Sequence, residues 1–92
     1  MIKSFKCRDT ESLYYDRPVK RFEAIERIAR RKLLMLASAA RLDDLRLPPG
    51  NRLEMLKGDR EGLHSIRIND RWRLCFMWQA AGAYDVEIVD YH

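Results

Sequence analysis

The sequence predicts an α+β fold, with helices in the first half of the chain and an antiparallel β-meander in the second. Apolar residues recur at spacings of three and four between Val19 and about Ala40, which is typical of a helix on a core. From Arg52 onward they alternate instead, as in half-buried strands. Helices gathered between one strand and a run of antiparallel strands favour this class. The 92 residues suffice for one small core, so residues 1–92 are expected to form a single domain.

The chain is expected to begin with a strand, followed by a short helix. Ile2–Cys7 alternates weakly between apolar and polar residues, as an N-terminal strand does. Asp9 or Thr10 is placed to cap a helix that runs through Tyr15. Pro18 suits the first turn of the next helix, where the missing N–H of proline has no intrahelical partner to lose.

The long helix predicted from Val19 to about Ala40 has an apolar face and a basic back. Its core stripe is Phe22, Ile25, Ala29, Leu33, Leu36 and Ala40. Its other faces carry Lys20, Arg21, Arg27, Arg30, Arg31 and Lys32. Two interpretations of the basic back stay open: a solvated surface, or a contact with RNA or a partner protein.

The second half of the chain contains the strands and turns of the expected meander. A short helical turn at Leu42–Leu47 should end at Pro48-Pro49-Gly50-Asn51, because two prolines and a glycine do not continue a helix. Asn69-Asp70 is a plausible hairpin turn, and Lys57–Gly62 reads as a charged loop. The strands are expected at Arg52–Leu56, Leu63–Ile68, Arg71–Trp78 and Tyr84–Tyr91.

Composition excludes several classes of protein. A hydrophobic fraction of 47% with 35% charged residues fits a globular protein with a charged surface. The sequence has no apolar run of membrane-spanning length and no signal-peptide pattern, so a cytoplasmic location without membrane contact is expected. Cys7 and Cys75 are expected to be buried thiols. With His64 and His92 as the two histidines, no metal site is expected.

The charges are distributed unevenly along the chain. The formal net charge is +4, from 18 basic and 14 acidic residues. Residues 1–32 contain ten lysines and arginines against five acidic residues, whereas residues 84–92 contain Asp85, Glu87 and Asp90 and no basic residue. A basic body indicates an anionic partner, and nucleic acid is the leading candidate.

The last three residues, Asp90-Tyr91-His92, place an acid, a phenol and an imidazole directly after a predicted strand. Histidine can donate or accept a proton near neutral pH. A metal-free ribonuclease needs a base for the 2′-hydroxyl, an acid for the leaving 5′-oxygen and cations at the phosphate. The meander offers cations at Lys57, Arg60, Arg67, Arg71 and Arg73, and proton-transfer groups at His92, Tyr91, Asp90 and Glu54.

Arg73 lies on an interior-type strand, where an unpaired charge is costly. It is expected to form an ion pair with Asp90 or Glu87, or to clamp a phosphate, and the two roles are compatible.

His64, Trp72 and Trp78 also lie on predicted strands. His64 is expected to be a structural, hydrogen-bonded histidine. The tryptophans are expected to be core or sheet-face aromatics, although aromatic rings can also stack on RNA bases.

Three motifs follow one another in the second half: Lys57-Gly58-Asp59-Arg60-Glu61-Gly62, then Trp72-Arg73-Leu74-Cys75-Phe76, then the terminal Asp90-Tyr91-His92. Each is a weak signal alone. Together they resemble the HigB toxins, which belong to the RelE/ParE superfamily of bacterial toxin–antitoxin systems. The resemblance covers essentially the whole chain, including the opening residues and the lead-in from Pro49 to Leu53.

The resemblance implies a RelE-like fold, with an N-terminal strand and helices packed on an antiparallel sheet. It implies a type II toxin that cleaves mRNA on the translating ribosome, without a metal or other cofactor, and thereby inhibits translation and growth. The implied partners are the ribosome, mRNA and a HigA-type antitoxin with a helix-turn-helix. Operator DNA would be bound only through the toxin–antitoxin complex.

The resemblance also implies a site. Matching positions give His92, Asp90, Tyr91, Lys57 and Arg73 as catalytic residues. Arg60 and Arg67 match basic positions of the pattern and, with Arg71 and Lys32, form the expected RNA-binding set. Lys57 and Arg73 would bind the scissile phosphate, and His92 would be the general acid. Asp90 would orient the imidazole, and Tyr91 would stack on a base or share in proton transfer.

Glu54 departs from the family pattern, because some relatives carry a histidine three residues before the loop lysine. Glu54 or Lys57 could act as the base, or the residue at position 54 could be unimportant. Two other functions stay open at this point. One is a non-nuclease toxin acting on DNA gyrase, as in the ParE branch, and the other is an inactive binding partner of an antitoxin.

Overall fold

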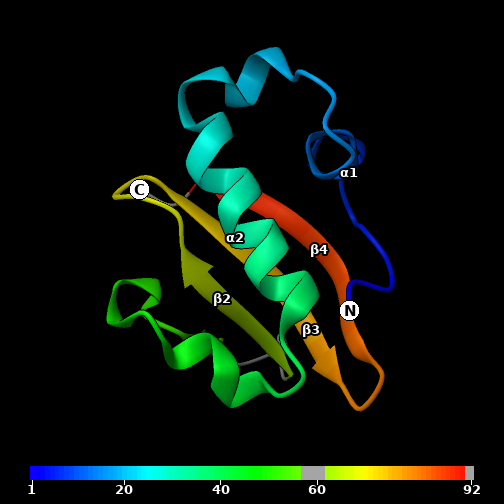
Figure 1. Cartoon of the computed structure of the whole chain (residues 1–92), viewed down its shortest axis with the longest axis vertical. Coiled ribbons are helices and arrows are strands. Elements are labelled where there is room, and N and C mark those ends of the chain that lie inside the picture. The colour runs from blue at the N-terminus through cyan, green and yellow to red at the C-terminus, as the bar shows by residue number, and fades with distance from the viewer. Residues whose placement is uncertain (57–61, 91–92) are drawn as a thin grey trace.

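The computed structural model describes residues 1–56 and 62–90, and these residues form an α+β fold (Figure 1). Two α-helices and three 3₁₀ helices precede all four strands. In chain order the elements are α1 (Arg8–Tyr14), η1 (Lys20–Ile25), α2 (Glu26–Ser38), η2 (Leu42–Arg46), η3 (Pro49–Asn51), β1 (Glu54–Met55), β2 (Leu63–Arg67), β3 (Trp72–Gln79) and β4 (Gly82–Asp90).

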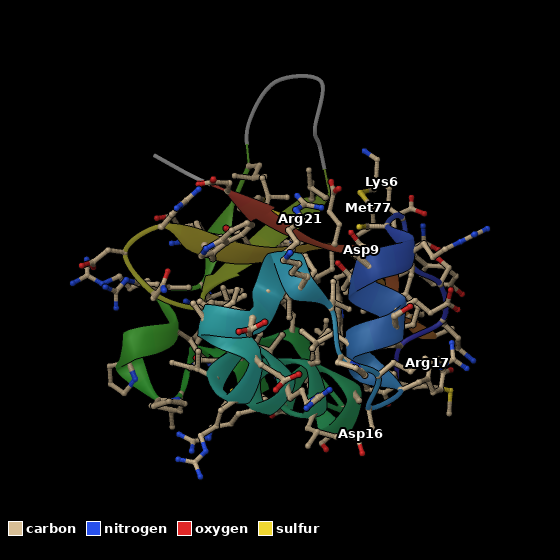
Figure 2. All side chains as sticks on the ribbon, turned by 90° about the horizontal axis from the view of Figure 1, so that it is seen from above. Lys6, Asp9, Asp16, Arg17, Arg21 and Met77 are labelled. Atoms are coloured by element: carbon tan, nitrogen blue, oxygen red, sulfur yellow. The ribbon has the colours of Figure 1, made fainter. Side chains whose placement is uncertain are left out.

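The four strands form one antiparallel sheet in the order β1-β2-β3-β4, which confirms the predicted meander. Figure 1 shows α2 lying across one face of this sheet, and the view turned by 90° in Figure 2 shows the helices together on that side. The segment between β2 and β3 turns at the predicted Asn69-Asp70, where the Asn69 side chain accepts bonds from the amides of Arg71 and Trp72.

The core lies between the helices and the inner face of the sheet. The predicted stripe residues Phe22, Ile25, Ala29, Leu33 and Leu36 are all buried. They pack against the strand residues Ile66, Trp72, Leu74, Phe76, Val86 and Ile88. Ala40, predicted to continue the stripe, is exposed, because α2 ends at Ser38 and the extended Ala39 takes the buried position.

The single helix predicted from Val19 to about Ala40 is two helices of different type. The first turns form the 3₁₀ helix η1, and Ile25 leaves the helical region with φ −116° and ψ 7° before α2 begins. In a 3₁₀ helix, residues three apart lie on the same side. Phe22 and Ile25 are three apart and both buried, so the tighter turn directs both side chains into the core.

The predicted N-terminal strand is wrong. The segment before α1 runs parallel to β4 and bonds to it at both ends, but it forms only the isolated bridges Ile2↔Ala83 and Phe5↔Val86. Between these bridges β4 bulges at Asp85, whose φ is +52°. The Asp85 amide donates to the Ser4 hydroxyl rather than to a backbone carbonyl. The bulge therefore interrupts the ladder, although the segment still covers the edge of β4.

Neither residue predicted to cap the first helix does so. The cap position is Cys7, which makes no side-chain capping bond. Thr10 is fully buried, and its hydroxyl accepts a bond from the Ile88 amide of β4. Asp9 lies 3.6 Å from Arg21. Both residues bind other parts of the fold, which attaches α1 to β4 and to η1.

Lys32 of α2 and Asn51 of η3 form a polar contact between the helix and the segment that leads to β1. The Lys32 ammonium donates to Asn51 Oδ1, and the Asn51 amide donates to the carbonyls of Leu45 and Leu47. Asn51 is fully buried and Lys32 is 8% exposed. Desolvation, helped by the charges of Arg31 and Arg67, lowers the pKa of Lys32. This contact holds η3, and hence the start of β1, against α2.

Within the described residues, no helix is long and apolar enough to cross a membrane.

Replacing Asn51 with alanine is expected to destabilise the protein by about 2–3 kcal/mol, since it leaves the buried ammonium of Lys32 without its acceptor. Lys32→Met removes the charge itself and should cost less. Urea unfolding of both variants and the parent measures the difference. Equal stability of Asn51→Ala and the parent would contradict this account of the contact.

Candidate functional site

The face of the sheet turned away from the helices carries two of the predicted basic residues, Arg67 and Arg73. The pairs Glu54↔Ser65, Ser65↔Cys75 and Cys75↔Glu87 lie directly opposite one another across the four strands, and Arg67 lies opposite Arg73. Side chains alternate along a strand, and the intervening residues face the core, so these six residues share one side. We call Glu54, Ser65, Arg67, Arg73, Cys75 and Glu87 the outer face.

Arg73 is the central cation of the outer face and is held by neutral groups. Its Nε donates to Ser65 Oγ over 2.8 Å, and its Nη2 donates to the Arg52 carbonyl over 2.7 Å. Glu54 Oε2 lies 3.9 Å from Nη2. The residue is 9% exposed. The predicted ion pair with Asp90 or Glu87 is wrong, because Asp90 bonds to Arg71 and Glu87 lies 3.7 Å from Lys6.

Arg67 is a second arginine on the outer face. It is directly opposite Arg73 across β2 and β3, and it bonds to Asp70 in the following turn. Like charges directly opposite on a sheet are destabilising. Two arginines in this arrangement present planar donors that match the oxygens of a phosphate. The Arg67–Arg73 pair offers donors of this type, and the phosphate contact stays a prediction.

Asp90 lies on the other side of the sheet from Arg73. It is opposite Trp72, in the row that also contains buried Leu74 and Ile88. Both Nε and Nη2 of Arg71 donate to its Oδ2, over 2.9 and 2.8 Å. This bond raises the pKa of Arg71. The Arg71 guanidinium also lies 5.3 Å from the Trp72 ring centre, so Arg71 fastens the end of β4 to the start of β3.

The structure brings some predicted site residues together and separates others. Arg67, Arg73 and Glu54 are neighbours, whereas Asp90 with Arg71 is on the opposite side. The burial of Lys32 and its bond to Asn51 argue against the RNA contact predicted for it. Lys57, Arg60, Tyr91 and His92 lie outside the described residues, so their part in the site stays a prediction.

Two groups that position Arg73 were missed by the sequence prediction. Ser65 lies two residues before Arg67 on a predicted strand, and a small hydroxyl in that position is a weak signal for such a contact. The Arg52 carbonyl had no signal in the sequence, because any residue carries one. Arg52 directs it by adopting φ +45° at the end of η3.

His64 is buried and stacks on Phe76, with ring centres 6.0 Å apart, as expected of a structural residue, but the hydrogen bond predicted for its ring is absent among the described residues. Desolvation lowers its pKa. Trp72 is also buried, and it packs edge-on against Phe22. These aromatic residues belong to the inner side of the sheet.

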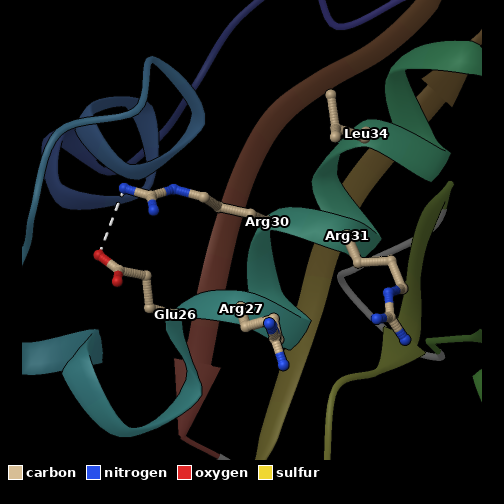
Figure 3. Close-up of a pocket in the computed structure, with 5 residues that line it drawn as sticks. All are labelled: Glu26, Arg27, Arg30, Arg31 and Leu34. Atoms are coloured by element: carbon tan, nitrogen blue, oxygen red, sulfur yellow. Dashed lines mark ion pairs between the residues drawn. The ribbon is translucent and has the colours of Figure 1, made fainter.

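The basic back of α2 has a hollow of about 530 Å³, lined by Glu26, Arg27, Arg30, Arg31 and Leu34 (Figure 3). Arg30 lies 3.3 Å from Glu26 and 3.5 Å from Asp16. Arg27 and Arg31 are exposed, and no ion pair joins either of them to a carboxylate among the residues that the structure describes. This surface is on the helical side, remote from the outer face, and a contact there stays a prediction.

In residues 1–56 and 62–90, no three side chains of His, Cys, Asp or Glu are grouped so as to hold a metal ion.

Comparison with known proteins gives a consistent result over the whole chain. Residues 3–92 match a family model described as the RelE-like toxin of the type II toxin–antitoxin system HigB. The chain is 42% identical over 80 residues to Toxin HigB-1 of Vibrio cholerae serotype O1, an alignment that covers 85% of this chain and 84% of the relative. It is 34% identical over 94 residues to Endoribonuclease HigB of Proteus vulgaris, an alignment that covers both chains completely.

The lowered pKa of His64 predicts a loss of stability in mild acid. Its folded pKa lies below its unfolded value of about 6.5, so the contribution is complete above that pH and is lost as the pH falls below it. Urea unfolding of the parent and of His64→Gln at pH 7.5 and pH 5.5 tests this. The parent should lose more stability between the two than the variant does. Parallel losses would contradict it.

Proposed function

The chain belongs to the HigB-like toxins, RelE-like toxins of type II toxin–antitoxin systems, and on this basis we propose that it is a metal-independent endoribonuclease that cleaves mRNA on the ribosome. One relative that aligns over its full length is named an endoribonuclease. The observation that carries the proposal is the Arg67–Arg73 pair on the outer face. The two arginines are direct cross-strand neighbours, and guanidiniums are planar donors that suit the oxygens of a substrate phosphate.

Arg73 binds the scissile phosphate in this proposal. Its Nε and Nη2 are engaged with Ser65 and Arg52, which fixes the plane of the guanidinium before substrate arrives. A fixed cation stabilises charge in the transition state without reorganising at the moment of reaction. Lys57 supplies a second cation, and Arg60 and Arg67 bind flanking phosphates.

His92 is the general acid that protonates the leaving 5′-oxygen, and Tyr91 stacks on a base or shares in proton transfer. Asp90 holds the chain that carries them, and its bond to Arg71 supports this part of the proposal. Arg71 accordingly acts through Asp90 rather than through RNA.

The ribosome holds the mRNA in position, so the enzyme itself needs fewer groups to position its substrate. A cognate antitoxin of HigA type neutralises the toxin, and operator DNA is bound through that complex. The protein acts in the cytoplasm, where its substrate is translated.

Arg73→Ala and His92→Ala are each expected to reduce mRNA cleavage by on the order of 100-fold or more, since each removes a group that acts in the transition state. Expression in cells, followed by mapping of transcript 5′ ends, measures this directly. The parent should produce cuts in phase with codons, and both variants should restore growth. Growth arrest with intact mRNA and broken double-stranded DNA would instead support a gyrase toxin.

Ser65→Ala is expected to reduce cleavage about tenfold while the protein stays folded, because Arg73 loses the acceptor of its Nε proton. Ser38→Ala is the matched control, since Ser38 is exposed at the end of α2. Cleavage rates on mRNA-programmed ribosomes and thermal unfolding are measured in parallel. Unchanged cleavage by Ser65→Ala would remove Ser65 from the site.

A further inference from the structure

Among the residues that the structure describes, Glu54 is the carboxylate that pairs with Arg73. Its Oε2 lies 3.9 Å from Arg73 Nη2, and its side chain is 55% exposed, so it is held beside the cation and still reachable by a substrate. Of the outer-face residues defined above, Glu87 is the other acid. It lies on β4 and pairs with Lys6.

The sheet order places Glu54 on one flank of Arg73. Glu54 is on β1, opposite Ser65 of β2, and Arg73 is on β3. On the other flank, Val89 of β4 is the direct neighbour of Arg73, and Asp90 is the next residue. In a displacement at phosphorus, the attacking and leaving oxygens lie roughly in line, on opposite sides. A phosphate on Arg73 would thus have Glu54 on one side and the end of β4 on the other.

We propose that Glu54 is the general base of the cleavage reaction, a role that the proposed function above leaves unassigned and on which this inference rests. Its carboxylate takes the proton of the ribose 2′-hydroxyl, the 2′-oxygen forms a bond to phosphorus, and the bond from phosphorus to the 5′-oxygen breaks. The leaving 5′-oxygen takes a proton from the general acid. The products are a 2′,3′-cyclic phosphate and a 5′-hydroxyl, so atoms and charges balance.

Among the outer-face residues, the basic neighbours of Glu54 are two arginines. Arg73 of β3 is the ion-pair partner, and Arg67 of β2 lies diagonally across from it on the same face. Arg73 holds the carboxylate beside the phosphate that Arg73 would bind. A carboxylate placed in this way can accept a proton from the sugar next to that phosphate.

The test uses single-turnover cleavage by the full chain on ribosomes programmed with a defined mRNA, measured as a function of pH. The variants are Glu54→Gln and Glu54→His, and the matched control is Glu87→Gln, which neutralises the other outer-face acid. Circular dichroism and thermal unfolding establish that each variant is folded. Product ends are identified as cyclic phosphate and 5′-hydroxyl.

Glu54→Gln should slow cleavage by on the order of 100-fold, because an amide can still bond to Arg73 but cannot accept the proton. Glu87→Gln should stay within about threefold of the parent. Glu54→His should retain substantial activity, with the acid-side fall in rate moved to higher pH than in the parent, because an imidazole replaces the carboxylate as proton acceptor.

Two results would overturn the assignment while leaving the nuclease function intact. One is full activity of Glu54→Gln. The other is an equal loss in Glu54→Gln and Glu54→His with the parent's pH profile, which would make Glu54 only a holder of Arg73. A parent that leaves the mRNA uncut at every pH would instead overturn the nuclease function, and the base assignment with it.

Discussion

Arg73 carries a charge on a nearly buried strand, and the contacts that satisfy this charge organise the outer face of the sheet. A guanidinium that is 9% exposed needs partners for its donors, since leaving them unpaired is costly. Those partners are the Ser65 hydroxyl and the Arg52 carbonyl. The carbonyl is in place because Arg52 adopts a left-handed conformation after η3. η3 is in turn held on α2 by the contact between Asn51 and Lys32. A chain of contacts therefore runs from the helix to the cation.

One face of the sheet packs on the core, and the other face carries charged residues. The alternation of side chains along each strand separates these two sets. Along β3, Trp72, Leu74 and Phe76 enter the core while Arg73 lies between them on the outer face. A shift of one residue in register would put the guanidinium in the core. The end of β4 is further fixed by the bond between Asp90 and Arg71. Packing of the inner face and placement of the cations are thus set by one register.

Much of the fold could be predicted from the sequence because periodicity reports burial. The stripe from Phe22 to Leu36 and the alternation of β3 are repeated patterns, and they place the core and the meander correctly. The predictions fail at positions where a single tertiary contact determines the local structure. Thr10 has the chemistry of a cap, yet its hydroxyl binds the amide of Ile88, which is distant in sequence. The bulge at Asp85, which interrupts the N-terminal ladder, likewise has no repeated pattern to report it.

Predicting the site was harder, because sequence gives the type of a residue and not its partner. Arg73 was expected beside Asp90 or Glu87, but register puts Asp90 on the opposite side and Glu87 near Lys6. The bond that Asp90 makes is with Arg71, which had been expected to touch RNA. Because Asp90 pairs with Arg71 and not with Arg73, it fixes the end of β4 rather than the central cation. Two residues extend at most about 7 Å, so the position of Asp90 limits where His92 can reach. A carboxylate fixed by two donors of one guanidinium is well suited to set that limit, and in the proposed mechanism Asp90 contributes by anchoring the chain as well as by its charge.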